Sequence, residues 1–265
     1  LCYACANRIP WITQPACIVC GRNIDCPDCQ RAEANTRHFL LNRSAVRYNT
    51  DIRNWLAAYK YRGDERYEKL FGQFLIESYY RMNIELSSWY GTTWAPAWIT
   101  SVPASRDRLQ ARGFDQAERV AVRLATKLKV SYIPLLQRNK QTIKQSEQGR
   151  YDRIRSMEGA FSCVSAARSL VSELLYPHNG PYESESFNEA KHSDNQHEEI
   201  ALSTISQERG FYNQVQSTLK AIPVLLVDDI YTTGSTINNC ARVLQQLGEQ
   251  FHVQFHVIAL TCARS

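Results

Sequence analysis

The feature that most limits the possible folds is the segment 224–236, which reads VLLVDDIYTTGST. Four apolar residues typical of a buried strand lead directly into Asp228 and Asp229, and a hydroxyl-rich loop with one glycine follows. After Gly234 the apolar spacing becomes that of an amphipathic helix. Ligands of open parallel sheets bind at the carboxyl ends of the strands, so this segment predicts a ligand site between a strand and a helix.

The chemistry of this segment suits a phosphorylated sugar. A helix N-terminus offers unpaired N–H groups and the positive end of the helix dipole, which both favour phosphate. Asp228 and Asp229 suit sugar hydroxyls or a hydrated Mg²⁺ ion. The candidate phosphate-binding residues, which supply hydroxyls and a permissive backbone, are Thr232, Thr233, Gly234, Ser235 and Thr236. The alternative is an ordinary strand, acidic turn and capped helix. Neither the P-loop nor the GxGxxG dinucleotide motif is present in this segment.

Apolar patterns predict alternating strands and helices from about residue 98 onward. We expect strands at 98–102, 130–136, 157–163, 222–227 and 252–260. Asp115 is expected to cap one helix, and another covers 235–247 and ends at Gly248. Upstream, Asp51 is expected to cap a helix, whereas residues 35–47 are interpreted as a linker. This alternation is typical of an α/β protein whose parallel sheet is flanked by helices.

Six of the nine cysteines form C-x-x-C pairs near the start of the chain, namely Cys2/Cys5, Cys17/Cys20 and Cys26/Cys29. Such pairs favour zinc over disulfides, because disulfides require an oxidising compartment that nothing in the sequence indicates. Residues 1–34 are therefore expected to be a small zinc-ribbon module that depends on metal to fold. One site needs four ligands. We favour Cys17, Cys20, Cys26 and Cys29, with Cys2 and Cys5 pairing with cysteines lost in an N-terminal truncation.

The composition is that of an ordinary globular protein. Of the 265 residues 44% are apolar and 22% charged, and no apolar run reaches the length of a membrane-spanning helix, so we expect a cytoplasmic protein without a membrane span. The formal charge of +5 permits contact with nucleic acid without indicating it. Residues 165–220 are polar and are interpreted as a surface insertion within a domain that covers 35–265.

Taken in order, the motifs resemble the ComF family of competence (DNA-uptake) proteins. The segment 224–236 resembles the phosphoribosyl pyrophosphate (PRPP) motif of type I phosphoribosyltransferases, and the cysteine pairs precede it as in that family. Further matching stretches are KYRGD at 60–64, SVP at 101–103 leading to Arg106, RGFDQ at 112–116 and GAF at 159–161. The resemblance covers nearly the whole chain except the 165–220 insertion.

This resemblance implies a type I phosphoribosyltransferase-like fold that binds PRPP with Mg²⁺. Asp228 and Asp229 would contact the ribose hydroxyls in the catalytic position, and residues 232–236 would cradle the 5′-phosphate. The implied contacts of the pyrophosphate loop and the hood over the site are Arg106, Arg112, Arg138 and Arg150. For the hood, a solvated basic loop is the alternative. Where that family carries Asn, this chain has Asp115, whose charge would oppose pyrophosphate unless it is compensated.

Three functions are compatible with these features. The favoured one is a PRPP-binding protein that acts in DNA uptake for natural competence, with single-stranded DNA and other DNA-uptake proteins as candidate partners. The second is an active phosphoribosyltransferase that transfers a phosphoribosyl group from PRPP to a nucleobase or amine. The third, a zinc-scaffolded interaction protein without a small-molecule role, is disfavoured by the segment 224–236. Candidate DNA contacts are Arg43, Arg47, Tyr48, Lys60, Tyr61, Arg62, Arg106, Arg108 and Arg112.

Overall fold

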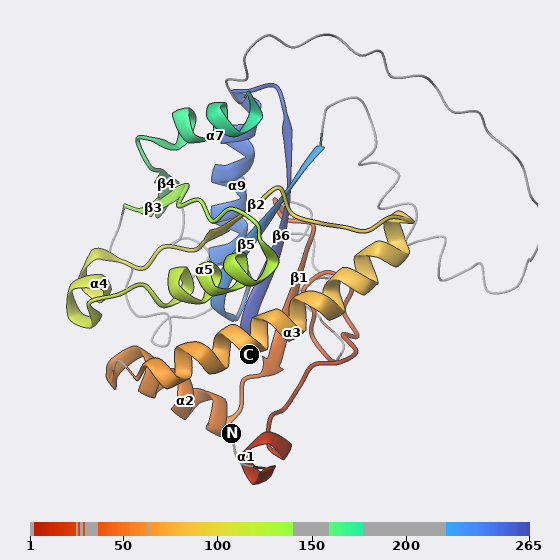
Figure 1. Cartoon of the computed structure of the whole chain (residues 1–265), viewed down its shortest axis with the longest axis vertical. Helices are drawn as coiled ribbons and strands as arrows, with labels where there is room; N and C mark the ends of the chain where they lie inside the picture. Colours follow the sequence, from red (N-terminus) through yellow and green to blue (C-terminus); the bar gives the residue numbers. More distant parts are fainter. Residues whose placement is uncertain are drawn as a thin grey trace, which may run out of the picture.

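The computed structural model describes residues 3–24, 26, 29, 37–62, 64–139, 159–176 and 221–265 (Figure 1). In chain order its elements are α1 (Tyr3–Asn7), β1 (Leu41–Arg47), α2 (Thr50–Arg62), α3 (Glu65–Tyr90), β2 (Trp98–Ser101), α4 (Arg106–Arg112), α5 (Gln116–Leu128), β3 (Leu136–Arg138), β4 (Phe161–Cys163), α7 (Ala167–Leu175), β5 (Ala221–Tyr231), α9 (Ser235–Glu249) and β6 (Gln254–Arg264). Helix α7 lies at the start of the predicted insertion, and residues 177–220 of that insertion lie outside the described residues.

Four parallel strands form the main sheet in the order β1–β6–β5–β2. The central strand β5 pairs with β6 along its length and with β2 over residues 224–227. A separate antiparallel pair, β3 and β4, lies beside this sheet (Figure 1). The prediction of an α/β fold with a parallel sheet flanked by helices is confirmed. Among the described residues, no helix combines the length and apolar character needed to cross a membrane.

Helices cover both faces of the sheet because β5 divides its buried apolar side chains between two cores. Val224 and Leu226 pack in a core built with α7 and α9. Leu225 and Val227 pack in a second core, built with α2, α3 and α5. A strand that is apolar on both faces is expected in a parallel sheet buried between helices. The central strand of the sheet is thereby packed on both faces.

Strand β1 corrects the interpretation of residues 35–47 as a linker. Its polar residues concealed the strand in the sequence, yet their side chains are buried and hydrogen-bonded inside the fold. Asn42 Nδ2 donates to the carbonyl oxygen of Cys20 at 3.2 Å, and the hydroxyls of Ser44 and Thr261 lie 2.7 Å apart. Because these partners belong to the cysteine module and to β6, the local sequence alone could not reveal them.

The N-terminal segment runs along the outer edge of β1. The Ile12 N–H donates to the Ala45 carbonyl at 2.9 Å, and the Asn42 N–H donates to the Val19 carbonyl at 2.7 Å. These bonds occupy backbone groups of an edge strand that would otherwise be unpaired. The cysteine module is therefore attached to the main sheet through backbone hydrogen bonds.

Two predicted helix boundaries were wrong. Helix α2 begins one residue earlier than Asp51, because the Asn49 side chain accepts the Ile52 N–H at 2.9 Å, while Asp51 pairs with Arg8 at 2.7 Å. Helix α9 continues through Gly248, where an added Cβ would lie only 2.9 Å from a backbone oxygen. That glycine permits a close approach within the fold and does not end the helix.

All five predicted strands differ in extent, and β2 ends one residue early at Ser101 while β4 begins only at Phe161. Strand β3 begins at Leu136, where the prediction had a strand ending, and Tyr132 forms only an isolated bridge to Ile99. Strand β6 begins at Gln254 and continues to Arg264. Strand β5 reaches Tyr231 because β6 runs beside it, so both strands continue four residues past their predicted ends.

Candidate functional site

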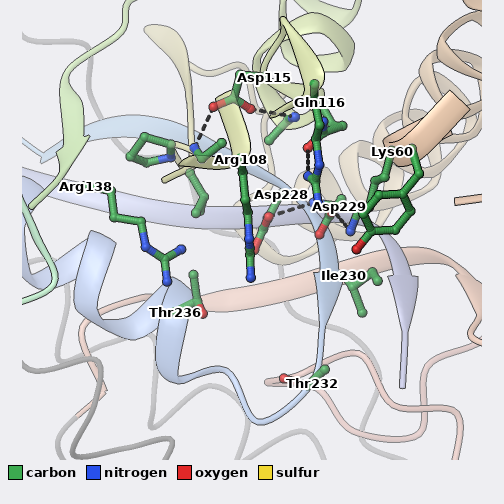
Figure 2. A pocket seen from close by; sticks show the side chains of 16 residues that line it. Lys60, Arg108, Asp115, Gln116, Arg138, Asp228, Asp229, Ile230, Thr232 and Thr236 are labelled. Carbon is green, nitrogen blue, oxygen red and sulfur yellow. Dashed lines mark hydrogen bonds and ion pairs between the residues drawn. The ribbon is translucent and has the colours of Figure 1, made fainter. Parts of the chain in front are cut away.

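A pocket of about 280 Å³ lies where β2 and β5 end, bounded by α2, α4, α5, β3 and the start of α9 (Figure 2). Positively and negatively charged side chains both line this pocket. The charged residues that line it are Lys60, Arg108, Arg112, Asp115, Arg138, Asp228 and Asp229. The segment 224–236 therefore leads from a buried strand into a pocket.

The acid pair lies within the last residues of β5, which corrects the prediction that the strand ends before it. Burial, together with the adjacent Asp229 carboxylate, raises the pKa of Asp228 well above its ordinary value. Burial acts on Asp229 in the same direction, but Lys60 together with Arg108 and Arg112 outweighs it, so the pKa of Asp229 is lowered. Asp229 is thus the carboxylate that forms an ion pair with Lys60. A bound cation or hydroxyl donor would instead stabilise the charged form of Asp228.

The residues predicted to bind phosphate follow directly, and they divide into two groups. Thr232 and Thr236 line the pocket. Thr233 and Ser235 lie outside the lining and bond to each other, with their hydroxyl oxygens 3.0 Å apart. Gly234 has φ of +82° and precedes α9 without a side-chain cap. The Ser235 N–H donates to the Thr233 hydroxyl at 3.4 Å, and the N-terminus of α9, whose cap residue has no side chain, is a position that suits an anion.

The cationic wall of the pocket contains two of the four arginines named from the sequence. Arg112 and Arg138 line it, whereas Arg106 is exposed at the start of α4 and Arg150 lies outside the described residues. Arg108 lines it as well. Figure 2 shows Arg108 beside Asp228, with the Arg138 guanidinium directed toward Thr236. Burial, with Arg108 nearby, lowers the pKa of Arg138.

Three pocket residues, Lys60, Tyr61 and Arg108, were assigned by the sequence only to DNA contact. Lys60 comes from α2, far from β5 in the chain, and its partner Asp229 is apparent only once the two elements pack together. Arg108 is the third residue of α4 and points to a different side of the helix from Arg106, so it can line the pocket while Arg106 is exposed. The sequence signals that could have pointed to Lys60 and Arg108 as pocket residues were the lysine of KYRGD and the second arginine after SVP.

Asp115 caps α5 and also holds the loop that follows β2. Its Oδ1 accepts the Ala117 and Glu118 N–H groups at 3.0 and 3.2 Å, and its Oδ2 accepts the Ala104 N–H at 2.6 Å. Burial raises the pKa of Asp115, and these three hydrogen bonds act against that rise. The predicted helix cap is confirmed. Three backbone donors also compensate part of the charge expected to oppose pyrophosphate.

Four cysteine thiols form the second candidate site. The sulfur atoms of Cys17, Cys20, Cys26 and Cys29 all lie within 4.8 Å of one another. Hydrogen bonds from the thiols of Cys20 and Cys29 lower the pKa of Cys17, which favours a thiolate in the cluster. Four gathered sulfur donors fit a structural zinc site. They are the four that the sequence favoured, while Cys5 is not part of the cluster and Cys2 lies outside the described residues.

The prediction that Arg43 contacts DNA was wrong. Arg43 is 5% exposed and forms an ion pair with Glu85, while its guanidinium lies 5.8 Å from the Trp89 ring centroid. It is an interior residue that joins β1 to α3. Arg47 and Tyr61, by contrast, are exposed, as the DNA-contact hypothesis requires of them.

Comparison with known proteins finds two related competence proteins. The chain is 24% identical over 258 residues to the competence protein ComFC of Bacillus subtilis (strain 168), covering 94% of this chain and 79% of that protein. It is 23% identical over 235 residues to the competence protein ComFC of Streptococcus pneumoniae (strain ATCC BAA-255 / R6), covering 84% and 76%. No family model and no solved structure matches the chain. Both similarities extend over most of the chain.

Proposed function

We propose that this chain, as a member of the ComF family of competence proteins, binds PRPP with Mg²⁺ in the pocket at the end of β5 and acts in DNA uptake. The observation that supports this most is the convergence of three elements in one pocket. An acid pair, the first turn of α9 at Thr236 and a wall of arginines all line the same cavity of about 280 Å³. A ribose that carries a phosphate at one end and a pyrophosphate at the other requires these three kinds of contact.

Each part of PRPP has a matching group in the pocket. The 5′-phosphate would bind at the first turn of α9 beside Thr236, where backbone N–H groups and the helix dipole favour it. The ribose hydroxyls would bind the acid pair. The pyrophosphate would bind Arg108 and Arg138, because guanidinium groups form bidentate hydrogen bonds to phosphate oxygens. Mg²⁺ would reduce the repulsion between that polyanion and Asp228.

Transfer of the phosphoribosyl group is the second candidate activity, and the position of Arg108 and Arg138 favours it. Cations placed at the pyrophosphate would stabilise the charge that develops as it departs. A nucleobase or amine nitrogen would attack the anomeric carbon, forming a C–N bond as the C–O bond to pyrophosphate breaks. This activity would release one pyrophosphate for each phosphoribosyl group transferred, whereas binding alone releases none.

Location and partners also belong to this proposal. The cysteine cluster requires reduced thiols, which agrees with a cytoplasmic protein. Single-stranded DNA is the proposed partner for exposed side chains such as Arg47, Tyr61 and Arg106. Contacts of this kind would make DNA affinity fall steeply with salt, whereas a PRPP site would respond to Mg²⁺.

Isothermal titration calorimetry with PRPP tests the proposal. The zinc-loaded wild type should bind in the presence of Mg²⁺, and the Asp228→Asn/Asp229→Asn variant should bind at least tenfold more weakly. Asp51→Asn is the matched control, because it removes a carboxylate whose partner is Arg8, away from the pocket lining. Absence of PRPP binding by the folded wild type, or equal binding by the double variant, would contradict the proposal.

A further inference from the structure

One buried arginine joins the cysteine cluster to the loop that follows β5. Arg264, at the end of β6, is 5% exposed. Its Nη2 donates to the Cys20 sulfur at 3.8 Å, and its Nη1 donates to the Thr232 carbonyl at 2.9 Å and to the Tyr231 carbonyl at 3.4 Å. The same guanidinium therefore contacts a candidate metal ligand and the backbone that leads into residues 232–236, here called the phosphate loop.

Tyr231 contacts both Arg264 and the phosphate loop. Its side chain is 4% exposed, and the Arg264 guanidinium lies 4.7 Å from the centre of its ring. The hydroxyl of Tyr231 is so close to Gly234 that an added Cβ there would lie 2.2 Å from it. A shift of Arg264 would therefore move the ring that supports the turn into α9.

A second set of bonds joins α9 to the chain that follows the cysteine cluster. The His38 N–H donates to Asn238 Oδ1 at 2.7 Å, and the His38 carbonyl accepts from Gln245 Nε2 at 2.9 Å. Phe39, the next residue, packs edge-on against Tyr231 with ring centroids 6.3 Å apart. Phe39 also shares a core with Cys20 and Cys26. The chain that follows the cysteine module thus contacts α9 through His38 and packs on Tyr231, just before the phosphate loop, through Phe39.

We infer that the cysteine module controls the conformation of the phosphate loop, and that Arg264 is the positioning residue that couples them. Bound zinc would keep Cys20 as a thiolate, to which a guanidinium donates a stronger, charge-assisted hydrogen bond than it does to a neutral thiol. With one nitrogen fixed on Cys20, the planar guanidinium presents the other to the Tyr231 and Thr232 carbonyls. The part of the inference that concerns ligand affinity rests on the proposed function, whereas the coupling itself does not.

The two contacts of Arg264 distinguish a coupling between the cysteine module and the phosphate loop from simple packing of its side chain. Arg264 is the link because its two terminal nitrogens contact separate partners, and a lysine has only one nitrogen for both. Arg264→Lys should keep the charge and most of the volume but lose one of the two contacts. Arg264→Met should lose both. If Arg264 served only as packing, Arg264→Lys would behave as the wild type does.

Hydrogen–deuterium exchange read by mass spectrometry tests the inference without any ligand. Compared with the zinc-loaded wild type, exchange at residues 232–236 should rise about tenfold after chelation and about tenfold in zinc-loaded Arg264→Met, the change expected for one charge-assisted hydrogen bond. Chelating zinc from the variant should add little, because both perturbations break the same connection. Arg123→Met, whose ion pair is with Glu68, should leave loop exchange unchanged.

Two results would overturn the inference. One is wild-type loop exchange in zinc-loaded Arg264→Lys. The other is an effect of chelation that adds fully to that of the variant. If Arg264→Met fails to retain zinc, Arg264→Lys with zinc stoichiometry measured by elemental analysis decides the question. If the wild type binds no PRPP, the proposed function fails while the exchange data still report on the coupling.

Discussion

Replacement of Gly234 by alanine tests how tightly the phosphate loop is built. At φ of +82° an L-residue pays roughly 1–2 kcal/mol for the left-handed conformation. The new Cβ would also lie 2.2 Å from Tyr231 Oη and 2.7 Å from its Cζ, so the buried ring must move. Such overpacking costs about 1–3 kcal/mol. Together we expect Gly234→Ala to lower the free energy of unfolding by about 2–5 kcal/mol.

Gly91→Ala is the matched control for this variant. Gly91 follows α3 with φ of +67°, and nothing lies within 4 Å of the Cβ that alanine would add. It should therefore show only the conformational cost, roughly 1–2 kcal/mol. Urea unfolding at constant zinc concentration gives both values, and a PRPP titration should show weakened binding for Gly234→Ala alone. Equal losses of stability in the two variants would refute the tight contact between Gly234 and Tyr231.

Three further substitutions probe the groups around the pocket and β1. Lys60→Met should lower the free energy of unfolding most at neutral pH. Above pH 3.8, the ordinary pKa of aspartate, the difference should shrink as pH falls, because without Lys60 burial makes Asp229 take up a proton on folding; below pH 3.8 the wild type also loses its Asp229 contribution, because its pKa is lowered. Urea unfolding across pH shows this, and a pH-independent loss of stability would contradict it. Asp115→Ala should cost about 1–2 kcal/mol in thermal unfolding because a helix cap and the Ala104 bond disappear together, and an unchanged melting temperature would count against this role. Arg43→Met should lower the free energy of unfolding by about 2–3 kcal/mol, because Glu85 loses its ion-pair partner. DNA affinity in a filter-binding assay should stay unchanged. A weakened, salt-dependent affinity would restore Arg43 as a DNA contact.

The sequence predicted elements whose signals are local. The apolar run before Asp228, the Asp115 cap and the amphipathic pattern of α9 each depend on neighbouring residues, and the structure has all three. The grouping of Cys17 with Cys20, Cys26 and Cys29 was likewise favoured from C-x-x-C spacing. Local capping, periodicity and ligand spacing therefore suffice for the fold class and for the composition of the thiol cluster.

What the sequence could not show depends on residues that are far apart in the chain. Strand β1 was missed because the buried polar side chains of Asn42 and Ser44 make hydrogen bonds to the cysteine module and to β6, which lie far away in the sequence. Lys60 was not paired with Asp229 for the same reason, since α2 and β5 meet only in the folded protein. The role inferred for Arg264 likewise needs Cys20 and Thr232 together in space.

The central claim, a PRPP site at the end of β5, is tested most directly by a crystal structure of the zinc-loaded protein with PRPP and Mg²⁺. We expect electron density for the 5′-phosphate at the first turn of α9 beside Thr236, with the ribose hydroxyls at Asp228 and Asp229 and the pyrophosphate toward Arg108. An empty pocket at saturating PRPP, or PRPP bound elsewhere on the protein, would contradict the claim.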